Sequence, residues 1–192
     1  MAVEREGAPE RATDPRVVRR AVPEDAPSVA AVHVRSWQAA YRGLVPDEVL
    51  DSLSVDRRAA LWVDAIADPN PRSGVWIAEQ GGVPVGFVHV RPTKDVDAAP
   101  STGEVSAIYL APEAWSLGLG RALLDSAVAD LRRNGFQAAT LWVFQDNERA
   151  RRFYERASWT PDGALKSIEI GGVLLPEVRY RIDLASRIGR SW

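Results

Sequence analysis

Apolar residues in the second half of the chain recur with the spacing of buried helices and strands. Over residues 118–134 they return every three or four positions, which predicts a helix with one buried face. The uninterrupted apolar run Ala138–Phe144 predicts a buried strand. Asp146 or Asn147 is a suitable N-cap for a further helix that extends to about Ala157. The apolar face of the first of these helices consists of Leu123, Leu124, Ala127, Val128 and Leu131.

Shorter elements precede and follow this region. Two helical regions are predicted, one from Pro23 to Gly43 and one from Pro46 to Pro71, the second with a break near Ser54. Gly81-Gly82 and Gly171-Gly172 each separate two β-rich runs, which predicts two hairpins. The remaining strands are assigned to residues 17–22, 75–79, 85–90, 104–110, 164–170 and 176–184, with a polar loop over residues 92–103.

In chain order the elements read β-α-α-β-β-β-α-β-α-β-β. This order predicts an α/β (α+β) fold with a mixed, mostly antiparallel sheet of about seven strands and helices on both faces. Because 192 residues suit one domain, we expect a single folded unit over residues 16–184. The charged segment 1–15 is expected to be a disordered leader, and residues 185–192 a C-terminal tail.

Composition excludes several kinds of chemistry. A net charge of −2 and a pI of about 5.8 do not favour binding to nucleic acid. The absence of cysteine excludes disulfides, thiolate nucleophiles and cysteine-ligated zinc. His33 and His89 lack HExxH spacing, so no metal is expected. No apolar run approaches the roughly 18 residues of a membrane span, and the first residues lack the apolar core of a signal peptide, which favours a cytoplasmic protein without a membrane partner.

The turn between the strand at 104–110 and the helix at 118–134 carries the most informative sequence. Gly118 and Gly120 allow backbone N–H groups to approach a ligand closely. The start of the helix adds free N–H groups and a positive dipole end, and Arg121 adds a charge, so a pyrophosphate would fit here. The alternative is a tight strand-to-helix turn without a ligand. Neither GxxxxGK[ST] nor GxGxxG is present, which excludes a P-loop and the dinucleotide fingerprint.

Two longer strings resemble the GNAT superfamily of N-acetyltransferases. The pattern P-E-x-x-x-x-G-x-G-R-x-L-L, which begins at Pro112, resembles motif A of that family. The segment Leu141–Trp159 resembles motif B, with an Asn, then A-x-x-F-Y-E and a closing aromatic residue. The resemblance covers roughly residues 16–184 and implies a GNAT-like fold and acetyl-CoA as cosubstrate. The chain departs from the usual phosphate loop at Trp115, where Gln or Arg is common, and at Ser116, where Gly is common.

The resemblance also implies which residues hold acetyl-CoA. Main-chain N–H groups of the loop would contact the pyrophosphate, and the backbone near Ile108 would polarise the thioester, an interaction worth about 3–4 kcal/mol. Tyr109 and Leu110 would pair with the pantetheine arm as an added strand does. Asn147 would contact the same arm, or would only cap its helix. The loop residues are Ser116, Leu117, Gly118, Leu119, Gly120 and Arg121.

Two side chains are candidates for proton transfer. An alkylamine is neutral in only about one molecule in 2,500 at pH 7, a cost of about 4.6 kcal/mol, so a base is useful. Glu104 is the candidate base, although about 13 Å of strand separates it from Ile108, and it could be a surface carboxylate instead. Tyr154 is the candidate acid for the leaving thiolate, and its helical spacing also suits a core residue.

The acceptor amine is the least defined part of the expected reaction. The first two helices and the last hairpin would shape its pocket, which directs attention to His33, Trp37, Tyr41, Arg42 and residues 163–178. Spacing makes Trp37 and Tyr41 candidates for plain helix packing. The expected acceptor is a primary amine of a small molecule or peptide, and a protein N-terminus is a further candidate.

Trp115 and Ser116 leave open a second function, that of a CoA-binding regulatory module without turnover. The acidic balance argues against acetylation of aminoacyl-tRNA. Dimers are common in the family, so a homodimer is a further expectation.

Overall fold

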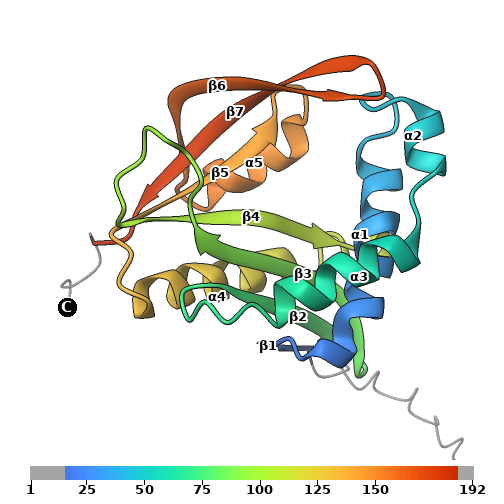
Figure 1. Ribbon diagram of the computed structural model, residues 1–192, viewed down its shortest axis with the longest axis horizontal. Coiled ribbons are helices and arrows are strands. Elements are labelled where there is room, and N and C mark those ends of the chain that lie inside the picture. Colours follow the sequence, from blue (N-terminus) through green and yellow to red (C-terminus); the bar gives the residue numbers. More distant parts are fainter. Residues whose placement is uncertain (1–15, 186–192) are drawn as a thin grey trace, which may run out of the picture.

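A computed structural model describes residues 16–185, which form one seven-stranded sheet and its helices (Figure 1). The strands are β1 (Arg16–Arg20), β2 (Gly74–Gln80), β3 (Val83–Pro92), β4 (Thr102–Leu110), β5 (Ala138–Phe144), β6 (Thr160–Ile170) and β7 (Val173–Asp183). The α-helices are α1 (Ala26–Ala40), α2 (Asp47–Asp51), α3 (Val55–Ile66), α4 (Leu119–Arg133) and α5 (Glu148–Arg156), and short 3-10 turns lie at Pro23–Asp25 and Pro112–Ala114.

The sheet has the order β1-β2-β3-β4-β5-β7-β6, and only the β4–β5 pair is parallel. Helices cover both faces. On one face α1 and α3 bury a cluster that includes Val29, Trp62 and Phe87. On the other face α4 and α5 pack over a larger cluster that includes Leu123 and Tyr180. The predicted fold class is therefore confirmed.

Strands β4 and β5 form the most irregular pair of the sheet. Their ladder is limited to three pairs, from Thr102↔Ala138 to Glu104↔Thr140. Beyond Glu104 the strands separate, so residues 105–110 have no partner on the β5 side. On its other side β4 contains a β-bulge, because His89 faces Ala107 while Val90 faces Val105. Ser106 is thus the extra residue of the bulge, a feature that bends a strand and redirects side chains.

The tip of the β6–β7 hairpin extends over β5 and reaches α2 (Figure 1). Ile170 and Leu175 pack there in a third apolar cluster with Val49 and Leu50 of α2. A methyl group added to Gly171 would lie 2.5 Å from a Val49 side-chain carbon, so hairpin and helix are in close contact. This contact closes one end of the space between β4 and β5.

Most predicted elements are present with modest differences in length. The break near Ser54 separates α2 from α3, and the Ser54 hydroxyl accepts the Arg57 backbone N–H of the new helix at 3.3 Å. Strands β3 and β4 are longer than predicted, because their ladder continues into the polar loop as far as Pro92↔Gly103. The expected leader, residues 1–15, and all but Ala185 of the expected tail lie outside the described residues. None of the described helices combines the length and apolar character that a membrane crossing requires.

Candidate active site

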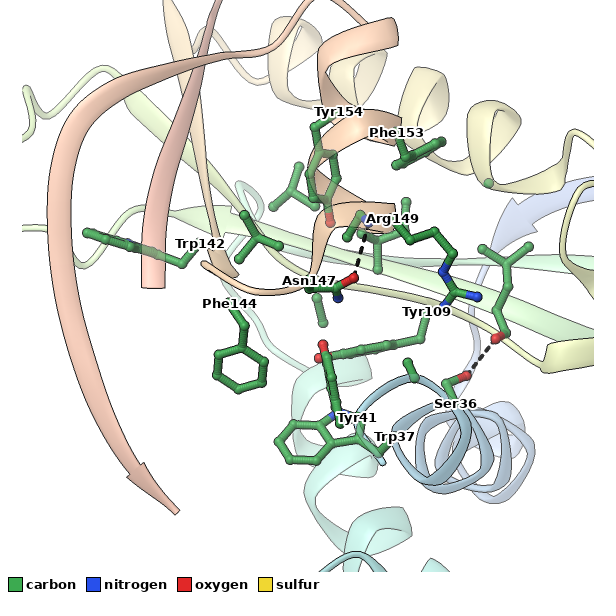
Figure 2. Close-up of a pocket in the computed structure, with 18 of the residues that line it drawn as sticks. Ser36, Trp37, Tyr41, Tyr109, Trp142, Phe144, Asn147, Arg149, Phe153 and Tyr154 are labelled. Carbon is green, nitrogen blue, oxygen red and sulfur yellow. Dashed lines mark hydrogen bonds between the residues drawn. The ribbon is translucent and has the colours of Figure 1, made fainter. Parts of the chain in front are cut away.

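A cavity of about 760 Å³ follows the gap between β4 and β5 (Figure 2). Its floor comes from β4, its ends from the loop before α4 and from the β6–β7 hairpin, and its sides from α1 and α5. Most of the predicted site residues line it, namely Glu104, Ile108, Tyr109, Leu110, Gly118, Gly120, Arg121 and Tyr154. Ser116 and Asn147 line it as well. The structure therefore brings together residues that are up to 50 positions apart in the sequence.

The loop before α4 has an open, left-handed backbone at two positions. Gly118 has φ 82° and serves as N-cap of α4, and no atom lies within 4 Å of where its Cβ would be. Ser116 has φ 64°, a conformation that favours glycine. Leu119 is buried in the core, so only its backbone is available to a ligand. Arg121 is exposed and ion-paired with Asp125 at 2.9 Å. An open N-terminal cradle of this kind fits a pyrophosphate.

Trp115 braces this loop rather than facing solvent. Its indole Nε1 donates to the Leu110 carbonyl at 2.9 Å, and the Ser36 hydroxyl donates to the same oxygen at 2.7 Å. Both lone pairs of that carbonyl are thus used, which leaves it no capacity to pair with a pantetheine arm. The guanidinium of Arg149 stacks on the indole, 3.5 Å from the ring centroid. Trp115, which stands where Gln or Arg is usual, is therefore paired with the cationic side chain of Arg149 from α5.

Arg149 is a pocket residue that the motif comparison does not identify. Burial lowers the pKa of its guanidinium, and no ion pair with an acidic residue within 16–185 offsets its charge. Arg152 and Arg156 of the same helix also line the cavity, and Arg152 is ion-paired with Glu148 at 2.7 Å. The signal in the sequence is the density of arginine in α5, at positions 149, 151, 152 and 156.

Tyr154 and Asn147 combine structural roles with access to the cavity. Tyr154 is 7% exposed, and Figure 2 shows its hydroxyl directed toward the interior of the pocket. Burial raises the pKa of this phenol, followed by the charge effect of Tyr109, so the hydroxyl keeps its proton at neutral pH. The Asn147 side-chain oxygen caps α5 by accepting the Ala150 N–H at 3.1 Å. Its amide N–H groups remain on the pocket side, so the capping and binding roles are compatible.

Glu104 lies in the pocket but is ion-paired. Its carboxylate accepts a hydrogen bond from Arg91 Nε at 2.9 Å, and the residue is only 8% exposed. Glu104 faces Arg91 across the β3–β4 ladder, two residues from the bulge residue Ser106. One of its oxygens is occupied by the guanidinium, which leaves the other for a substrate or water.

Aromatic rings form the end of the cavity between α1 and the last hairpin. Tyr41 contacts Trp37 and Phe144 edge-on, with ring centroids 5.1 and 5.0 Å apart (Figure 2). The hairpin adds Glu177 and Lys166, which are 3.4 Å apart. This combination of rings with a partly buried carboxylate suits an amine that carries an apolar body.

A buried arginine holds this end in place. Arg179 of β7 pairs with Asp95, Asp97 and Asp162 at 3.1, 2.7 and 2.8 Å. Trp142, which lines the pocket, donates its indole N–H to Asp95 at 3.0 Å. The network joins the loop between β3 and β4 to the last hairpin, so the two walls of the cavity are fixed relative to each other.

Two of the acceptor candidates do not reach the cavity. His33 packs among aromatic rings, stacked on Tyr109 at 5.0 Å, and its Nδ1 accepts the Trp62 indole N–H at 3.1 Å. Burial, with a smaller effect from the Arg58 charge, lowers the pKa of His33 to about 3. Arg42 lies on the surface and pairs with Asp47 and Asp51. The packing interpretation of His33 is therefore correct.

Comparison with known proteins identifies the family. Residues 34–159 match the model of the acetyltransferase (GNAT) family. A probable N-acetyltransferase from Mycobacterium tuberculosis is 32% identical over 169 residues, which cover 86% of this chain and 92% of the relative. The chain belongs to the GNAT family of acetyltransferases. The resemblance predicted from the two sequence motifs is confirmed, and the protein is an acetyl-CoA-dependent N-acetyltransferase.

Two further comparisons agree with this assignment. An uncharacterised N-acetyltransferase from Bacillus subtilis, YuaI, is 34% identical to this acetyltransferase over 164 residues, with coverage of 84% of the chain and 89% of the relative. The structure of the PaiA N-acetyltransferase from Thermoplasma acidophilum in complex with coenzyme A superposes with a TM-score of 0.65 at 20% identity. That superposition covers 85% of this acetyltransferase and 98% of the other chain, and it supports the fold.

Proposed function

We propose that this acetyltransferase transfers the acetyl group of acetyl-CoA to a primary amine of a small molecule or peptide, by direct attack in a ternary complex. The observation that carries the proposal is the continuous cavity from the Gly118 loop to the aromatic end between α1 and the last hairpin. A cosubstrate bound from one end and an amine bound from the other would meet beside β4. Acetyl-CoA, when bound, supplies the thioester.

The charge distribution of the cavity supports this orientation. Arg121 and Arg149 lie at the end with the open helix N-terminus, where phosphates would be held. The opposite end carries Glu177 and the rings of Tyr41 and Phe144. An amine with an apolar body is the acceptor that this end fits best.

In this proposal main-chain groups stabilise the thioester oxygen, and side chains transfer protons. The unpaired stretch of β4 around Ile108 offers main-chain N–H groups to the thioester oxygen, which would stabilise the developing negative charge. Tyr154 keeps its proton and would donate it to the departing sulfur. Glu104, through the carboxylate oxygen that Arg91 leaves available, would attract the cationic amine or accept a proton through water.

Calorimetric titration with acetyl-CoA tests the binding half of the proposal. Gly118→Trp should abolish micromolar binding, because the new side chain fills the cradle. Gly82→Trp is the matched control: Gly82 also has positive φ and open space around it, but lies in the β2–β3 turn away from the cavity. Binding that survives in Gly118→Trp, or is lost equally in Gly82→Trp, would contradict the assigned site.

Thiol release with a panel of amines tests turnover. Wild type should release CoA with at least one primary amine that has an apolar body. Tyr154→Phe should lower kcat by about 100-fold while acetyl-CoA still binds, because the ring is retained and only the proton donor is lost. Micromolar acetyl-CoA binding without turnover on any amine would favour a CoA-binding module instead.

A further inference from the structure

A chain of hydrogen-bonding side chains leads from the cavity to the surface through β3. The Ser106 hydroxyl lies 2.8 Å from His89 Nδ1, and His89 Nε2 lies 3.4 Å from the Ser73 hydroxyl. Ser73 is 1% exposed, and its side chain, after the backbone N–H of Asn70, contributes by hydrogen bonding to the lowered pKa of the exposed Asp68 carboxyl. The chain starts at the pocket, because Ser106 is one of its lining residues.

The carboxylate at the outer end sets the direction of every bond in this chain. An ionised carboxylate only accepts, so the Ser73 hydroxyl donates to Asp68. The Ser73 oxygen must then accept from His89 Nε2–H, since a hydroxyl has one hydrogen to give. A neutral imidazole with its hydrogen on Nε2 has a lone pair on Nδ1, which accepts the Ser106 hydroxyl hydrogen. The oxygen of Ser106 therefore keeps its own lone pairs available.

The bulge of β4 places Ser106 in this position. As the extra residue opposite His89, it has no partner in the β3 ladder, and its hydroxyl turns toward the imidazole. The alternative acceptor for its hydrogen, the His89 carbonyl, is more distant at 3.4 Å. Bulges beside active sites commonly redirect a side chain in this way.

We propose that Ser106 and His89 form a proton relay that removes the proton from the attacking amine and delivers it through Ser73 to Asp68. The relay rests on the proposed acetyl transfer and adds a route for the proton. The resemblance to the two GNAT motifs assigns no role in the reaction to any of these four residues.

The proposed transfer balances in protons and charge. As the amine nitrogen bonds to the carbonyl carbon, its N–H bond breaks and the proton passes to the Ser106 oxygen. Ser106 gives its original hydrogen to His89 Nδ1, His89 gives its Nε2 hydrogen to Ser73, and Ser73 gives its hydrogen to Asp68. The net result is one proton moved from the amine to an exposed carboxylate, which exchanges it with water. Only Asp68 ends with a changed charge, while His89 ends with its hydrogen on Nδ1 instead of Nε2.

The surroundings of His89 keep the imidazole neutral. Burial, together with the positive charges of Arg91 and Lys94 and against the opposing charge of Asp68, lowers the pKa of His89 to about 4. Trp62 contacts the imidazole edge-on, with ring centroids 5.8 Å apart. A neutral ring with a free Nδ1 is the form that can receive the hydrogen of Ser106, and it predominates at pH 7.

Kinetics with two amines of different basicity test the relay. One is an alkylamine that wild type accepts, and the other is its fluorinated analogue, similar in size but less basic. Ser106→Ala and His89→Gln should each lower kcat for the alkylamine by about 100-fold. The loss for the fluorinated analogue should be much smaller, because its nitrogen, once bonded to the carbonyl carbon, is acidic enough to release its proton to water. Ser126→Ala on α4, outside the lining residues, is the control.

The same variants distinguish the relay from a purely structural role. Disordered packing around β4 would lower kcat for both amines to the same extent, and that result would overturn the proposal. Unchanged kinetics in both variants would overturn it as well. Acetyl-CoA binding, measured by calorimetry in each variant, should equal that of wild type, because neither side chain lies at the phosphate end.

Nitrogen-15 NMR of the imidazole rings gives a readout that needs no amine. The sequence contains two histidines, so His33→Gln assigns both sets of ring signals. We expect His89 to be the neutral Nε2–H form at pH 7, with an Nδ1 signal that shifts in Ser106→Ala. An Nδ1–H form would overturn the relay. If wild type turned over no amine, the proposed function would fail, and the NMR result would still decide the bond direction that the relay requires.

Discussion

Replacement of Arg149 by methionine is the sharpest test of how this acetyltransferase holds its cosubstrate. Methionine keeps a long apolar chain over the Trp115 ring but removes the charge that stacks 3.5 Å from it. If Arg149 contacts a phosphate of acetyl-CoA, the loss should be specific to ligands that carry the phosphates. The stacking on Trp115 contributes equally whichever ligand is bound.

The expected magnitude follows from the kind of contact. A hydrogen bond to a charged group contributes ~1.5–3 kcal/mol. Loss of one such contact corresponds to a roughly 10- to 150-fold higher Kd for acetyl-CoA. The cation–π contact, worth about 0.5–2 kcal/mol, acts on the stability of the loop. It should therefore appear as a lower unfolding free energy in the absence of ligand.

Calorimetry with acetyl-CoA and with acetylpantetheine, which lacks the phosphates, separates these effects. Arg149→Met should weaken acetyl-CoA and leave acetylpantetheine nearly unchanged. Arg181→Met is the control, because Arg181 is exposed on β7 outside the cavity and its loss changes the net charge equally. Equal weakening of both ligands, or an unchanged Kd for acetyl-CoA, would refute the assignment of Arg149 to the phosphates.

Three further predictions concern stability. Ser116→Gly should raise the free energy of unfolding in urea by about 1 kcal/mol, because Ser116 has φ 64°; an unchanged midpoint would contradict this. Gly103→Ala should lower it by about 1–3 kcal/mol, since the new methyl would lie 2.5 Å from a Leu131 carbon, and a neutral effect would show that this part of the core can relax. The folded-state pKa of His33, about 3, lies below the unfolded value near 6.5, so stability present above pH 6.5 is lost as the pH falls toward 3. Urea titrations at pH 7 and pH 5 should show about 2 kcal/mol less pH-dependent loss in His33→Gln than in wild type, and equal loss in the two proteins would contradict the assigned pKa.

Local patterns were sufficient to predict much of the fold. Helical spacing from Leu123 to Leu131 predicted α4, because a helix that covers a sheet needs one continuous apolar face. The apolar run of β5 and the capping residue Asn147 were likewise readable, since each depends on neighbouring residues only. Ends of strands were less accurate, because the β3–β4 ladder extends into a segment with no β-rich pattern.

Contacts between distant segments were not readable from the sequence. Trp115 is recognisable in the sequence as a departure from the family pattern, but its stacking partner Arg149 lies 34 positions away on α5. The pairing of Ser106 with His89 depends on a bulge, and the register of a bulge is a property of two strands together. Glu177 reaches the cavity only because the last hairpin folds back over β5.

The short β4–β5 ladder has a consequence for the dynamics of the protein. Only three residue pairs join β1–β4 to β5–β7 within the sheet, and the third pair ends at Glu104. Amide hydrogens of β5 and β7 should therefore exchange with solvent through a partial opening that leaves β2 and β3 protected. A cosubstrate that occupies the gap would join the two parts, so acetyl-CoA should slow exchange in both β5 and β7, although β7 does not border the gap. Bound acetyl-CoA would thus determine whether the two parts of the sheet open separately or as one cooperative unit.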